Sequence, residues 1–309
     1  MIAERSTRAS TLVRDNYPRV LAVVGITAAV EWANNHFDLD RPALSVAAVT
    51  LLVTALSIFL VFRVNEAYQR WWEARTLWGS IVNDSRSFAR QVLSLLTPVP
   101  GDPESERSVR ALQREMVLRQ IAWVNALRLS LRRQDELDPL APFLAPGEAE
   151  SLSGIADRPT RLMLTQARLL GEARAAGQLG EMAQHRIETT MTSLQNAQGG
   201  CERIKKTPFP DRVVYFTRLC AWSLAIVIPV ALMARSDSFD PIDYVVLPFM
   251  MLAFLITERL GAELKNPFEN QPNDTPMTAI CRTIEIGLLE QLGDAETPPP
   301  LEPENGILM

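Results

Sequence analysis

The chain has 309 residues, of which 47% are hydrophobic and 22% are charged, and its formal net charge is −5. This acidic balance gives no overall positive field and argues against a nucleic-acid partner. The three cysteines are odd in number and widely spaced, so they indicate neither a disulfide framework nor a zinc site. The first residues contain no apolar core before a small-residue cleavage site, so we expect no cleaved signal peptide.

Four apolar segments lie in two pairs, and we expect each segment to cross a membrane. Val20–Ala33 comes first and is apolar for only part of its length. Ala43–Phe62 carries no charge and has about twenty residues, the length that a hydrocarbon core of roughly 30 Å requires. Val213–Ala234 is as long but holds Arg218, a charge that is tolerated only near an end or facing protein or water. Tyr244–Thr257 is shorter. For the two short segments a buried core helix is the alternative, but each is paired with a stronger segment across a short loop.

The distribution of charge around these segments predicts their orientation. Lys and Arg gather before the first segment, after the second and before the third, whereas the two short loops are rich in Asp. Because positive residues accumulate on the cytoplasmic side, we expect both termini and the long middle region to be cytoplasmic. The predicted organisation is a cytosolic N-terminal segment (1–19), transmembrane helices 1 and 2 (20–62), a cytosolic helical region (63–212), transmembrane helices 3 and 4 (213–257) and a cytosolic C-terminal segment with a disordered tail (258–309).

The middle of the chain is predicted to be helical and soluble. Between Ala43 and about Leu96 there is no proline and one glycine, which predicts one long helix or two helices stacked nearly end to end. The amphipathic stretch 106–137 predicts another helix, and 161–198 predicts two more around a glycine hinge. Beyond Asn266 the chain is rich in turn-forming residues, and its last residues lack apolar content. With no strand-like alternation, the fold class is an all-α membrane protein.

The sequence offers little material for catalysis. It has two histidines, no phosphate-binding glycine loop, and carboxylates that alternate with arginine as on solvated helix faces. We therefore expect no enzyme. A channel, a secondary transporter or a non-conducting membrane scaffold remains possible, although a transporter would normally show internal repeats.

Four blocks of sequence carry a resemblance to a known family. FLVFRVNEAYQRWWEARTLWGSIVNDSRSFARQ (59–91) resembles the segment that follows the second transmembrane helix of bacterial bestrophins, and 119–132, 199–220 and 264–285 resemble further blocks in the same order. The similarity covers about residues 15–290. The signature residues are Arg63, Arg70, Trp71, Trp72, Glu73, Arg75, Trp78, Glu202, Arg203 and Pro208.

The resemblance implies a homopentameric ion channel in the bacterial inner (plasma) membrane. Each subunit would give four transmembrane helices and a cytosolic helical bundle around a central pore. The subunits themselves, membrane lipid and monovalent ions would be the partners. The permeant ion would be chloride or another anion, or a sodium-type cation.

The resemblance also implies a narrow neck on the second transmembrane helix. Its side chains would be Thr54, Ile58 and Phe62, which are spaced to share one helix face. The family pattern is apolar at all three positions, so Thr54 departs from it. The alternative is that Ile58 and Phe62 simply pack against neighbouring helices. A second, cytosolic aperture falls on Leu179, for which a helix cap is the alternative.

Eukaryotic relatives hold calcium with an acidic run after an NPF motif. Here that run is ENQPND, in which Glu269 and Asp274 are the only carboxylates. Because Ca²⁺ takes six to eight oxygen ligands, several of them carboxylates, we expect no calcium dependence or only weak binding. We expect no other cofactor, and no metal site is indicated.

Overall fold

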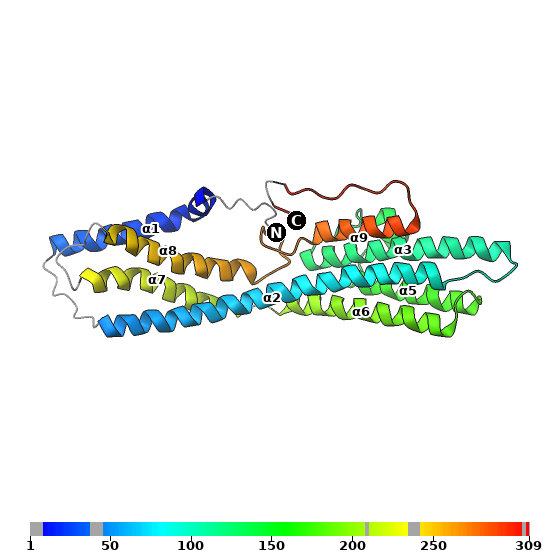
Figure 1. The fold of residues 1–309 in the computed structure, drawn as a ribbon, viewed down its shortest axis with the longest axis horizontal. Helices are drawn as coiled ribbons and strands as arrows, with labels where there is room; N and C mark the ends of the chain where they lie inside the picture. The colour runs from blue at the N-terminus through cyan, green and yellow to red at the C-terminus, as the bar shows by residue number, and fades with distance from the viewer. Residues whose placement is uncertain (1–8, 38–45, 208–209, 234–241, 305–306, 309) are drawn as a thin grey trace. The chain divides into compact units, whose positions relative to one another are not determined.

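A computed structural model describes residues 9–37, 46–207, 210–233, 242–304 and 307–308. These residues form helices joined by turns, with no strand among them and a single backbone bridge between Glu304 and Ile307 (Figure 1). The elements are α1 (Ala9–His36), α2 (Val46–Leu95), α3 (Pro103–Arg132), η1 (Ala141–Phe143), α4 (Glu148–Ser151), α5 (Arg158–Ala175), α6 (Glu181–Lys206), α7 (Asp211–Met233), α8 (Asp243–Leu264) and α9 (Met277–Leu292). The all-α prediction is confirmed.

The chain contacts divide the protein into two compact units. The apolar unit comprises residues 4–71 and 208–266, and the bundle unit comprises residues 1–3, 72–207 and 267–309. The division falls inside α2, so the first half of this helix belongs to one unit and the second half to the other.

Helix α2 is continuous over 50 residues. At 1.5 Å per residue it is roughly 75 Å long, far longer than a membrane requires. No proline interrupts its hydrogen-bond ladder. The structure therefore confirms the single long helix and excludes the stacked pair.

The apolar unit is built from α1, α7, α8 and the first half of α2. Helix α1 packs against α7 and α8, which also pack against each other, and the core between them includes Val23, Ala221, Leu224, Leu247 and Met251. Among the described helices, three are long and apolar enough to cross a membrane: those covering Ala47–Leu95, Arg212–Ala231 and Asp243–Leu264. Helix α1 is not one of them. The support for the first of the four predicted membrane spans is therefore only that α1 packs against α7 and α8.

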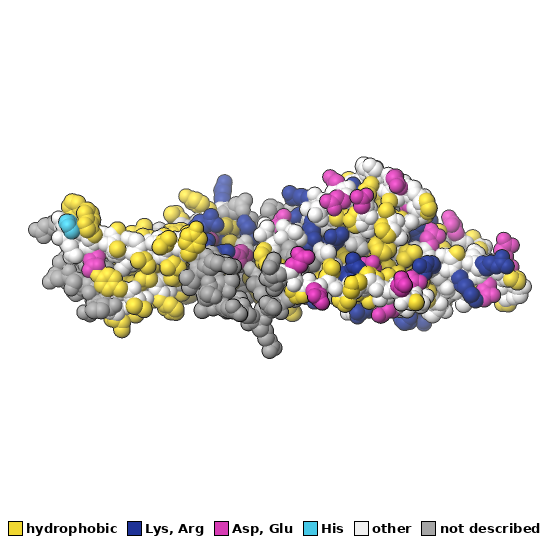
Figure 2. Space-filling model, turned by 90° about the horizontal axis from the view of Figure 1, so that it is seen from above, with side chains coloured by type: hydrophobic (Ala, Val, Ile, Leu, Met, Phe, Trp, Pro, Cys, Tyr) yellow, Lys and Arg dark blue, Asp and Glu magenta, His cyan; other side chains and the backbone are white. Residues whose placement is uncertain are grey.

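The bundle unit has a conventional helical core around α3. This helix begins at Pro103, where the carboxylate of Asp102 accepts a hydrogen bond from the amide of Glu104 at 3.0 Å. It packs against α5, α6 and α9, and its Ile121, Trp123 and Leu127 are fully buried. Figure 2 shows charged side chains spread over the surface of this unit and mainly hydrophobic ones on the visible face of the apolar unit.

Helix α9 was not expected, because the sequence after Asn266 reads as turn-rich. Its apolar residues nevertheless recur at helical spacing, with Met277, Ile280, Cys281, Ile284 and Leu288 buried in the core of the bundle unit. The proline and polar residues of 267–276 obscured this pattern. After α9 the described chain forms no further helix.

Candidate functional site

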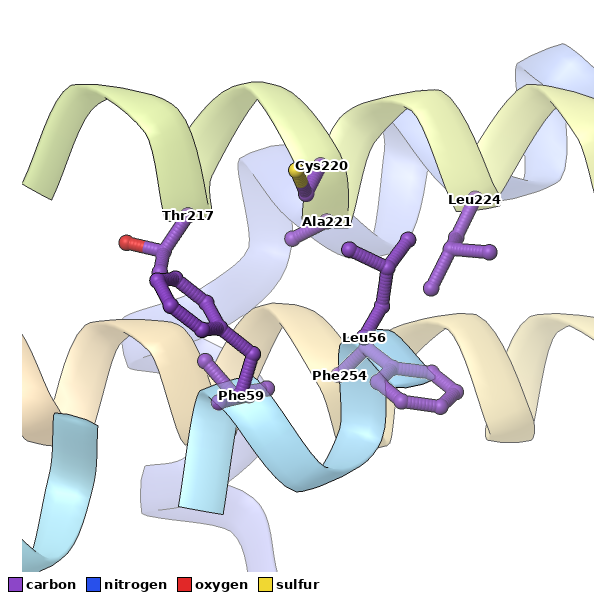
Figure 3. Close-up of a pocket in the computed structure, with 8 residues that line it drawn as sticks. Leu56, Phe59, Thr217, Cys220, Ala221, Leu224 and Phe254 are labelled. Carbon is purple, nitrogen blue, oxygen red and sulfur yellow. The ribbon is translucent and has the colours of Figure 1, made fainter. Parts of the chain in front are cut away.

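The first half of α2 has one face that packs inside its own unit. Leu56, Phe59 and Leu60 line a pocket together with four residues of α7 and Phe254 of α8 (Figure 3). The Phe59 ring also meets Phe216 of α7 edge-on, with the ring centroids 5.6 Å apart. This apolar contact fixes which face of α2 is turned toward the rest of the subunit.

The predicted neck residues lie on the other side of α2. Ile58 is 53% exposed, Phe62 is 64% exposed, and Thr54 is exposed too. Each step of four residues turns about 40° around a helix, so the three side chains share one stripe, whereas Leu60 lies about 160–200° away from the centre of that stripe. The structure brings the three residues together on an apolar face that the subunit itself leaves uncovered.

Thr54 is less polar in this setting than its side chain suggests. Its hydroxyl donates to the carbonyl of Thr50, one turn earlier, at 2.8 Å. A hydroxyl that is bonded to its own helix needs no water partner, a pattern that Ser and Thr use within helices. The departure from an all-apolar stripe is therefore smaller than the sequence implies.

A buried ion pair lies directly beyond the stripe. The Nη1 of Arg63, the residue after Phe62, is 3.2 Å from Oε1 of Glu258 on α8, and the side chains are 2% and 6% exposed. The same guanidinium nitrogen donates to the hydroxyl of Thr217 on α7. Arg218 approaches the same carboxylate oxygen at 3.6 Å from a more exposed position. Arg63 therefore joins α2 to both α7 and α8.

Gly261 makes room for this junction. A Cβ atom at this position would lie 3.2 Å from Cγ2 and 3.6 Å from the Cα of Val64. Because Gly261 has no side chain, the backbone of α2 can approach α8 closely at this position, which is one helical turn after Glu258.

The other signature residues of α2 differ in their burial. Trp71 stacks on Tyr68, with the ring centroids 6.0 Å apart. Trp72 is 56% exposed, whereas Trp78 is fully buried in the bundle core. Arg70 and Arg75 are half-buried.

The signature residues of α6 fix that helix to α2 and to itself. Arg203 forms an ion pair with Glu73 of α2. Glu202 accepts hydrogen bonds from Gln198 at 2.8 Å and from Lys206 at 2.9 Å. Pro208 lies outside the described residues.

Leu179 does not have the placement that an aperture requires. It lies between α5 and α6 and is only 4% exposed, within the core of the bundle unit. A pore constriction needs side chains on the outside of the subunit. Three residues further on, Met182 lies in the first turn of α6. Its large apolar side chain is 72% exposed.

The two carboxylates of the predicted calcium run each make a hydrogen bond, although Oδ1 of Asp274 is buried without a hydrogen-bond partner among the described residues. Glu269 accepts a hydrogen bond from Nζ of Lys205 at 2.8 Å. Asp274 is 2% exposed, and its Oδ2 accepts the amide of Gln271 at 3.0 Å. Burial raises the pKa of Asp274, while backbone amides of the same turn lower it. Within the described parts of the chain, no three His, Cys, Asp or Glu side chains gather as metal ligands would.

Comparisons with known proteins agree with one another. The family model described as Bacterial/Fungal Bestrophin protein matches residues 5–290. A Ralstonia nicotianae protein named voltage-dependent anion channel-forming protein RSc3414 is 32% identical over 90% of this chain and 87% of its own. The Escherichia coli K12 protein named voltage-dependent anion channel-forming protein YneE is 31% identical over 84% and 81%. A crystal structure of a bacterial bestrophin homolog from Klebsiella pneumoniae superimposes with a TM-score of 0.80 at 27% identity, covering 91% of this chain and 98% of that one.

Proposed function

The chain belongs to the bacterial and fungal bestrophin family, and we propose that it is an integral membrane protein that forms an ion channel. The relatives named as anion channel-forming proteins support this function, since they match most of this chain's length.

We propose that five subunits surround a pore whose neck is lined by Thr54, Ile58 and Phe62. The observation that carries this proposal is the exposed apolar stripe on α2. Only 11% of the apolar, membrane-length stretch of α2 is buried within the subunit, whereas 33% of the corresponding stretches of α7 and α8 is buried. Rings of isoleucine and phenylalanine would gate the pore by dewetting, without a charged filter.

We propose four crossings, with α1 as the first because it packs with α7 and α8. The protein would lie in the bacterial inner membrane with both termini in the cytoplasm, and the bundle unit would be cytosolic. The cytosolic aperture would be formed by Met182 rather than Leu179.

Purified protein in a planar bilayer is expected to give ohmic single-channel steps, and reversal potentials under a NaCl gradient report which ion passes. Protein-free bilayers and bilayers with heat-denatured protein are the controls. Saturable ion flux without steps would favour a secondary transporter. An absence of flux from intact oligomers would favour a non-conducting scaffold.

Calcium is expected to have little effect on this channel. Glu269 is paired with Lys205, and Oδ2 of Asp274 accepts a backbone amide, so these two carboxylates offer few of the six to eight oxygen ligands that Ca²⁺ takes. Adding EGTA should leave both the melting temperature and the current unchanged. Steep activation by micromolar calcium would contradict this expectation.

A further inference from the structure

The first four charged residues of α2 after the neck stripe are Arg63, Glu66, Arg70 and Glu73, and the structure separates them. Arg63 is buried against Glu258, and Glu73 is paired with Arg203. Arg70 is half-buried. Glu66 is exposed and forms no ion pair with any residue that the structure describes. The uncompensated exposed charge nearest to Phe62 on this helix is therefore negative.

Glu66 lies at the edge of the neck stripe, about 80° around the helix from Ile58 and about 20° from the direction of Phe59. It lies one turn beyond Phe62 and about 40° further around the helix. Its neighbours Asn65 and Gln69 are exposed as well, whereas Ala67 is buried on the packing side. The stripe thus changes from apolar to polar and acidic directly after Phe62.

We propose that Glu66 is a charge-selecting residue of this channel. This inference rests on the proposed function: in the pentamer, five Glu66 side chains would surround the cytosolic end of the neck. A ring of carboxylates in a confined, low-dielectric passage concentrates cations and excludes anions. The neck itself is uncharged, so the ring at its mouth would favour the passage of monovalent cations and hinder the passage of anions.

The test compares Glu66→Gln with the wild-type channel in planar bilayers under a KCl gradient. Glutamine keeps the size and removes the charge. We expect the cation-to-anion permeability ratio to fall roughly tenfold at low salt, and Glu66→Lys should lower it further. Glu66→Asp should keep most of the wild-type ratio. Glu136→Gln makes the same charge change at an exposed residue in the turn after α3, and it should have no effect.

Salt dependence separates an electrostatic ring from a packing effect. The Debye length falls from about 30 Å at 0.01 M to about 3 Å at 1 M, so the difference between wild type and Glu66→Gln should shrink as KCl rises. If the wild type conducts and Glu66→Gln leaves its permeability ratio unchanged at low salt, this inference is wrong and the proposed channel stands. If the wild-type protein gives no current, the proposed function fails and the inference fails with it.

Discussion

Replacing Glu258 by glutamine is expected to destabilise the apolar unit by about 3–5 kcal/mol, the usual cost of removing one partner of a buried ion pair. Glu258 is the acceptor that compensates Arg63 in a setting where both side chains are almost fully buried. A glutamine would still offer its amide oxygen as a hydrogen-bond acceptor beside the Thr217 hydroxyl, but it would leave the charged guanidinium without a counter-charge. A buried charge without its counter-charge is costly because neither water nor a carboxylate solvates it.

The effect can be measured as the melting temperature of detergent-solubilised protein and as its fraction of intact oligomer. Glu263→Gln is the matched control. It removes a carboxylate on the same helix whose ion pair with Arg259 is about one-third exposed on both sides, so it should cost less than about 1 kcal/mol. Replacing Arg63 by Met and Glu258 by Leu together should restore much of the stability, since buried pairs can often be exchanged for apolar residues. A Glu258→Gln protein as stable as Glu263→Gln would contradict the prediction.

Local patterns in the sequence predicted the helices well where they were uninterrupted. The lack of proline between Ala43 and Leu96 was sufficient for α2, and the glycines after Ala175 marked the break between α5 and α6. The string RWWEAR supported the family assignment, which the comparisons confirm. Helix α9 was missed because its signal starts immediately after a proline-rich turn, and because its partner α3 lies far away in the sequence.

The candidate site is built from contacts between residues far apart in the chain, and the spacing of residues in the sequence does not predict such contacts. Arg63 and Glu258 are 195 positions apart, and a single sequence gives no reason to join them. For the same reason the first four charges after Phe62 could not be assigned a direction until the packing of α2 against α7 and α8 was known. Leu179 shows the other limit, because the sequence alone does not tell which residue near the start of α6 is buried and which is exposed.

The second large effect is expected when the side chains of the proposed neck are shortened. Phe62→Ala and Ile58→Ala are each expected to raise single-channel conductance several-fold. Both side chains are more than half exposed on the subunit, so shortening them leaves the subunit core intact. In the assembled pore the same change would widen an apolar constriction and make it easier to wet, which lowers the barrier to a hydrated ion.

Phe59→Ala is the control that separates a pore lining from packing. Phe59 lies on the same helix but contacts Phe216 and the pocket against α7, so its loss should reduce stability without raising conductance. Oligomers must be shown to be intact by size-exclusion chromatography before currents are compared. Unchanged currents from intact Phe62→Ala and Ile58→Ala oligomers would assign these two residues to contacts between helices. If conductance rises in both Phe62→Ala and Ile58→Ala but not in Phe59→Ala, the barrier to ions lies on the exposed stripe of α2. The two variants shorten side chains on that stripe, whereas the control shortens a side chain that packs against α7.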